Sequence, residues 1–75
     1  HPVHLAQTFR KFHRTTVGNY LRQIRLENAR RELAETKLSI SEISYLNGFS
    51  DQSHFSRLFK KEFQTTPSEY RRNVS

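Results

Sequence analysis

The 75-residue sequence contains no cysteine, so neither a disulfide framework nor a thiolate metal site holds its fold together. It has only two glycines and two prolines, and no stretch alternates apolar and polar residues over the length of a strand. No run approaches the ~18 apolar residues that span a bilayer, and the first residues resemble neither a signal peptide nor a transit peptide. We therefore expect an all-α, soluble chain that works in the cytoplasm and has no membrane partner.

Acidic residues are also scarce, with seven Asp and Glu against thirteen Lys and Arg, for a net charge of +6. This sign attracts a polyanion such as nucleic acid or an acidic membrane face, and charge alone does not choose between them. A chain this short buries only ~60% of the surface that it exposes when unfolded. The composition therefore predicts one small domain with a thin stability margin.

Two helix starts follow the capping-box pattern, in which the side chains of the N-cap residue and of the third helical residue bond each other's backbone. Ser39 and Glu42 form one such pair and open a short helix over 40–46. Thr66 and Glu69 form the other, with Pro67 at the first helical position, where proline is favoured. The second pair opens a C-terminal helix that we expect to fray soon after Tyr70.

Between these helices, Gly48 stands where a helix C-terminus needs a left-handed residue. Ser50 is expected to cap the next helix, which runs to about Glu62. Its core-facing residues are predicted to be Phe55, Leu58 and Phe59, and the preceding short helix is expected to cover them with Ile40, Ile43 and Leu46.

The longest helix is predicted over 16–36, and its apolar residues form two groups on opposite sides. At 100° per residue, one side holds Val17, Tyr20, Leu21 and Ile24, and the other holds Leu26, Ala29 and Leu33. A helix of this kind can bridge two small cores. The alternative is burial in a single larger core, which the flanking arginines disfavour because they leave little continuous apolar surface.

The sequence repeats itself with a period of fifty residues. Seven of nineteen aligned positions are identical, where ordinary residue usage gives about one. The identical pairs are His4 and His54, Phe9 and Phe59, Lys11 and Lys61, Thr15 and Thr65, Thr16 and Thr66, Tyr20 and Tyr70, and Arg22 and Arg72. Two copies of one structural unit explain this similarity.

The second copy has a short helix, a tight turn with glycine and a second helix with polar and basic residues on its outer side. This order is typical of the helix-turn-helix, although the turn alone is more often an ordinary helical corner. We expect residues 1–15 to be the remnant of a first unit with its recognition helix, 16–36 a linker helix, and 37–75 the second unit with the C-terminal helix. Since the counterpart of the helix at 40–46 would precede residue 1, the first unit is expected to be N-terminally truncated.

Three stretches resemble the C-terminal signature of AraC/XylS-type bacterial transcription regulators. They are Ile40 to Ser44, Gly48 to Lys61, and Thr66 to Arg71, and upstream residues from His4 to Ala29 resemble the family's first recognition helix and linker helix. The resemblance implies two helix-turn-helix units that read successive major-groove segments of promoter DNA and recruit RNA polymerase. It also implies a ligand-sensing or dimerisation domain N-terminal to this chain.

The sequence departs from that family pattern at three places. Arg14 and Gln64 stand where the family has glycine after each recognition helix, and each is strained if it keeps a left-handed backbone. Ser44 replaces a preferred alanine, and its hydroxyl is expected to bond a helical carbonyl one turn back.

The candidate DNA-binding residues fall into base-reading and phosphate-binding groups. In the second unit Gln52 and Arg57 are the strongest base readers, because Gln pairs bidentately with adenine and Arg with guanine. Bases or phosphates are expected to contact Ser53, His54 and Ser56, and phosphates to contact Lys60, Lys61 and Ser39 at a helix N-terminus. In the first unit the corresponding residues are Val3, Ala6 and Gln7 for bases, and Arg10, Lys11 and Arg14 for phosphates.

Other interpretations are weaker. The basic residues could form a solvated face, which their repetition in both units disfavours. The nearest rival is a helical module that binds an acidic protein, and it predicts weak dependence on DNA sequence and no role for Gln52. The His spacing lacks a metal-ligand pattern, so neither a metal nor a cofactor is expected. A membrane-active bundle needs a wide exposed apolar face. The sequence has no catalytic triad, Cys-His pair or phosphate-binding glycine loop, so it does not predict an enzyme.

Overall fold

The computed structural model describes residues 16–74, and the regular structure of this part is helical throughout. Its elements are α2 (Val17–Glu35), α3 (Ile40–Leu46), α4 (Gln52–Phe63) and α5 (Pro67–Val74). The proposed remnant of a first unit, including its truncation, lies outside the described residues. None of the helices within 16–74 is long and apolar enough to cross a membrane.

The helix α2 is capped at both ends by threonines that satisfy some of its terminal backbone groups. The Oγ1 atom of Thr16 accepts a hydrogen bond of 3.1 Å from the backbone N–H of Asn19. At the other end, the backbone N–H and the hydroxyl of Thr36 both donate to the carbonyl of Glu32. These bounds fall within the range 16–36 that the sequence predicts for the long helix.

Both predicted capping boxes are present. The backbone N–H of Glu42 donates to Ser39 Oγ, and the backbone N–H of Ser39 donates to the Glu42 carboxylate. Thr66 and Glu69 exchange the same pair of bonds at the start of α5. The bond from the backbone of the N-cap residue, followed by the bond from its hydroxyl, lowers the pKa of each glutamate below its ordinary value of 4.5.

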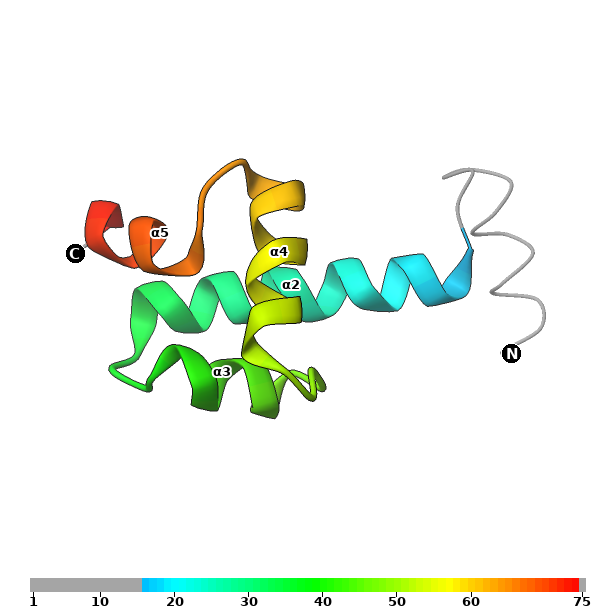
Figure 1. Ribbon diagram of the computed structural model, residues 1–75, viewed down its shortest axis with the longest axis horizontal. Coiled ribbons are helices and arrows are strands. Elements are labelled where there is room, and N and C mark those ends of the chain that lie inside the picture. Colours follow the sequence, from blue (N-terminus) through cyan, green and yellow to red (C-terminus); the bar gives the residue numbers. More distant parts are fainter. Residues whose placement is uncertain (1–15, 75) are drawn as a thin grey trace.

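The core of the described residues lies against the C-terminal half of α2. Figure 1 shows α4 crossing α2, with α3 and α5 beside the part of α2 that ends at Glu35. The buried apolar residues are Leu26, Ala29, Leu33, Ile43, Phe49, Phe55 and Phe59. The ring of Phe55 lies 5.1 Å from Phe49 and 5.7 Å from Phe59 between centroids, so one aromatic row joins the turn to α4.

The two apolar sides of α2 differ in burial. Leu26, Ala29 and Leu33 are buried under the helices that follow. The other side keeps 36% to 46% of its residue surface exposed, and its members are Val17, Tyr20, Leu21 and Ile24. Of the two apolar groups predicted on α2, one therefore packs in the core and the other stays partly exposed within residues 16–74.

The turn between α3 and α4 has the expected left-handed glycine but a different helix cap. Gly48 has a φ of +88°, and its N–H donates to the carbonyl of Tyr45. The N-cap of α4 is Asp51, whose carboxylate accepts from the backbone N–H of Ser53, so the prediction of Ser50 was wrong by one residue. Both residue types cap well, and the chain path out of the turn places Asp51 at the helix start.

Leu46 does not cover the core as the sequence predicted, since 62% of its surface is exposed. On α3 the core side is defined by Ile43 and Ser44, which are buried, and by Ile40, which packs against the core cluster. At 100° per residue, Leu46 lies about 110° from the centre of that side. The last residue of this short helix therefore faces outward.

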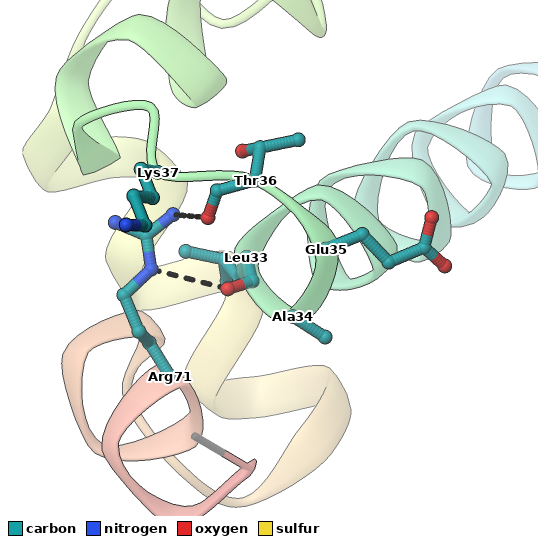
Figure 2. A pocket seen from close by; sticks show the side chains of 6 residues that line it. All are labelled: Leu33, Ala34, Glu35, Thr36, Lys37 and Arg71. Atoms are coloured by element: carbon teal, nitrogen blue, oxygen red, sulfur yellow. Dashed lines mark hydrogen bonds between the residues drawn. The ribbon is translucent and has the colours of Figure 1, made fainter.

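The helix α5 is anchored to the end of α2 by Arg71. Its Nε donates to the carbonyl of Leu33 at 3.1 Å, and its Nη2 donates to the carbonyl of Thr36 at 3.2 Å (Figure 2). These carbonyls belong to the last turn and C-cap of α2, where a helix leaves acceptors unpaired and a cation is favourable. Contrary to the expected early fraying, α5 continues to Val74.

Gln64, the C-cap residue of α4, has a left-handed backbone conformation with a φ of 61°. A side chain in this region costs energy that glycine avoids. The Gln64 side chain donates from Nε2 to the carbonyl of Lys61, which satisfies one acceptor at the end of α4. The strain expected at this departure from the family pattern is therefore present, whereas Arg14 lies outside the described residues.

Ser44 is buried, and its Oγ makes no hydrogen bond. The expected bond to a helical carbonyl one turn back is absent, so that prediction was wrong. A hydroxyl that leaves water without gaining a partner costs about 1–3 kcal/mol. Ser44 is therefore a local weakness in the packing of α3.

We predict that Ser44→Ala stabilises the chain by about 1–2 kcal/mol, because it removes the unpaired hydroxyl and leaves a methyl group of suitable size. In a domain of this length the midpoint of thermal unfolding should rise by roughly 4–8 °C per kcal/mol. The matched control is Ser41→Ala on the exposed side of α3, which reports helix propensity alone. Equal shifts in the two variants would contradict a cost of burying the hydroxyl.

The capping boxes predict a loss of stability in acid. Because the folded pKa of Glu42 and Glu69 is lowered, their contribution is complete above the ordinary value of 4.5 and disappears as pH falls through the lowered pKa. The double variant Glu42→Gln/Glu69→Gln keeps one acceptor oxygen in each capping box, and neither amide side chain titrates. Its unfolding midpoint should depend less on pH below 4.5 than that of the wild type, and an equal dependence in the two proteins would contradict the prediction.

Candidate nucleic-acid interface

The outward side of α4 carries most of the predicted contact residues. Because Phe55 and Phe59 face the core, the polar residues of this helix lie along its other sides. The exposed ones are Gln52, Ser53, His54, Arg57, Lys60 and Lys61, whereas Ser56 is only partly exposed. The structure therefore leaves six of the seven predicted α4 residues open to a ligand and partly covers the seventh.

Ser53, Arg57 and Lys60 are spaced three or four residues apart, so they form one stripe along α4. This stripe faces away from Phe55. Gln52 differs from the others, because at 100° per residue it lies only about 20° from Phe59 around the helix axis. It is exposed because it is the first residue of α4, beyond the edge of the core.

The long polar side chains of α4 are not engaged within the described residues. Gln52, Arg57 and Lys61 make no side-chain hydrogen bond or ion pair there, so their donors remain available. Lys60 and Lys61 also occupy the last turn of α4, where positive charge stabilises a helix end. Lys60 lies close enough to Glu69 to contribute to the lowered pKa of that carboxyl.

Ser39, the predicted phosphate contact on α3, is exposed at the start of that helix. Its Oγ already accepts from the backbone of Glu42, and the Glu42 carboxylate lies against the backbone N–H of Ser39. A phosphate at this end of α3 would therefore meet a negative charge. The Ser39 hydroxyl also contributes a hydrogen bond that lowers the pKa of Glu42, so both donors of Ser39 face that carboxylate.

Asn47 and Glu32 fix the position of the turn that precedes α4, and the sequence analysis does not identify this pair. The Asn47 side chain donates from Nδ2 both to the carbonyl of Ile43 and to the carboxylate of Glu32 on α2. Asparagine directly before glycine is a signal for a turn. The partner on α2 cannot be found from such a local signal.

The remaining predicted contacts are not described by the structure. Val3, Ala6, Gln7, Arg10, Lys11 and Arg14 all lie in residues 1–15, outside the described part. Within residues 16–74 there is no group of three His, Cys, Asp or Glu side chains that could hold a metal ion. The described candidate residues are therefore those on the polar surface of α4, together with Ser39 at the start of α3.

The chain is similar to known proteins in sequence and in fold. The family described as "Helix-turn-helix domain" matches residues 1–73. The protein named "Probable transcription factor PqrA" from Proteus vulgaris is 44% identical over 70 residues, which cover 93% of this chain and 57% of that protein. The transcriptional regulator GlxA from Rhizobium meliloti is 46% identical over 71 residues, which cover 95% of this chain and 22% of that protein.

Among solved structures, the xylose-binding transcription activator XylR superposes with a TM-score of 0.87 at 37% identity. The match covers 97% of this chain and 19% of the XylR chain. This chain therefore spans little more than half the length of PqrA and about a fifth of GlxA and XylR. On the family match and these relatives, the chain belongs to the helix-turn-helix family of AraC/XylS-type transcription regulators.

Proposed function

We propose that this chain binds promoter DNA sequence-specifically, with α4 as the recognition helix in the major groove. The observation that carries the proposal is the division of α4 into a core side with Phe55 and Phe59 and an exposed side with unengaged polar and basic side chains. A helix that follows a tight turn and presents such a side has the dimensions and chemistry that the major groove accepts.

Gln52 and Arg57 are proposed to read base edges. Both are exposed, and neither side chain is held by another group within residues 16–74. Glutamine can pair with adenine through two hydrogen bonds and arginine with guanine, and each good pair contributes ~1–3 kcal/mol of discrimination. Gln52 opens α4, so it belongs to the turn that would enter the groove first.

Phosphates are proposed to bind the basic residues nearer the end of α4, Lys60 and Lys61, because long flexible ammonium groups suit point contacts to phosphate. Ser53, His54 and Ser56 flank the base readers and are proposed to contact either bases or phosphates. Ser39 is a weaker phosphate candidate because of the Glu42 carboxylate beside it. The contacts of the first unit at Val3, Gln7, Arg10 and Lys11 remain part of the proposal, as do an N-terminal sensing domain and RNA polymerase as partners.

We predict that the chain binds a matching duplex with a steep dependence on salt. Each phosphate that a Lys or Arg neutralises releases counterions and contributes ~−0.9 to the slope of log affinity against log salt concentration. Fluorescence anisotropy of labelled duplexes over a range of KCl concentrations measures this slope. A protein that instead binds acidic proteins would show little preference among duplex sequences.

The two groups of residues on α4 should behave differently when mutated. Arg57→Ala should flatten the base preference at one segment of the site, because the loss of a bidentate pair removes discrimination there. Lys60→Ala should weaken binding to all duplexes about equally and reduce the salt slope by about one unit. Selection from random duplexes at a fixed salt concentration compares them, and identical profiles would refute the division.

A further inference from the structure

The guanidinium of Arg25, in the middle of α2, lies against the turn that leads into α4. A Cβ atom placed on Gly48 would lie 3.3 Å from Arg25 Nε, 3.4 Å from Cζ and 3.6 Å from Cδ. Glycine at position 48 therefore suits the left-handed φ of +88°, and its lack of a side chain also leaves space for Arg25. The missing side chain of Gly48 leaves room for the Arg25 side chain beside the turn.

Arg25 lies there without a polar partner among residues 16–74. It is exposed, and its side chain makes no hydrogen bond or ion pair within residues 16–74. A neighbouring arginine on α2 differs in this respect, because Arg30 pairs with the Glu27 carboxylate and lies over the ring of Phe63. The five N–H donors of Arg25 thus remain available to a ligand.

Arg25 lies near the end of α4 that is proposed to enter the DNA groove. Gly48 is four residues before Gln52, the first residue of α4, so a group packed on this turn lies near the end of α4 that is proposed to enter the groove. The backbone phosphates at the edge of a groove are the groups next to a helix end seated in it. Arg22, one turn earlier on α2, is also exposed and extends the positive charge along the helix.

From this geometry we propose that Arg25 contacts a DNA phosphate from the linker helix, with Gly48 providing the space that orients its guanidinium. The inference rests on the proposed function and adds to it a contact from outside the two recognition helices. Arginine suits this role because its planar fork can stack on backbone and still present several donors to a phosphate. Such a contact carries no base information itself.

The test compares Arg25→Gln, Arg25→Lys and the control Arg31→Gln in the 75-residue chain, with a duplex obtained by selection. Arg31 is an exposed arginine of the same helix, but at 100° per residue it lies about 120° from Arg25 around the axis. Arg25→Gln should weaken binding several-fold and lower the salt slope by about 0.9, with base preference unchanged. Arg25→Lys should keep the wild-type slope, and so should Arg31→Gln.

Thermal unfolding of each variant separates this role from packing. If Arg25→Gln lowers the unfolding midpoint but keeps the wild-type salt slope, Arg25 only packs on the turn and the inference is overturned, while the proposed function stands. A loss of slope in Arg25→Lys equal to that in Arg25→Gln would also overturn it, because the charge is retained. A wild-type chain with no duplex binding would overturn both proposals.

Discussion

Phe55 and Phe59 reach full burial because α2 presents Leu26, Ala29 and Leu33 to the helices that pack on it. Ala29 is completely buried, and a small residue there allows close approach of the neighbouring elements. Burying one large apolar side chain contributes ~1.5–3 kcal/mol, so these few contacts supply much of the stability of a domain this small. The polar anchors lie around the same part of α2, where Glu32 binds Asn47 and the final carbonyls bind Arg71. The orientation of the polar side of α4 is thus determined mainly by one short stretch of α2.

Features that depend on neighbouring residues could be predicted from the sequence. The capping boxes at Ser39 and Thr66 and the left-handed Gly48 each involve bonds within a few residues, so the local pattern contains the whole interaction. The error in the cap of α4 concerned Ser50 and Asp51, which are adjacent and both able to cap a helix. The exposure of Arg57, Lys60 and Lys61 followed from helical periodicity alone.

Features that depend on how the helices meet could not be predicted. The burial of Ser44 without a partner and the exposure of Leu46 are set by which side of α3 faces α2 and α4. The pairs of Asn47 with Glu32 and of Gly48 with Arg25 join residues fifteen and twenty-three positions apart. Hydrophobic patterning shows that two helices pack together. It does not show how far one helix is shifted along the other, and this shift decides which residues meet.

Because α2 has two apolar sides, the number of residues between them matters as much as which residues they are. Leu21 and Ile24 point to one side, whereas Leu26 and Ala29 are buried on another. One residue inserted between Ile24 and Leu26 would turn the sides relative to each other by about 100° and lengthen the helix by about 1.5 Å. No substitution elsewhere could undo such a rotation, because it changes the phase of every later residue. Evolution can therefore exchange side chains along α2 far more easily than it can add or remove a residue.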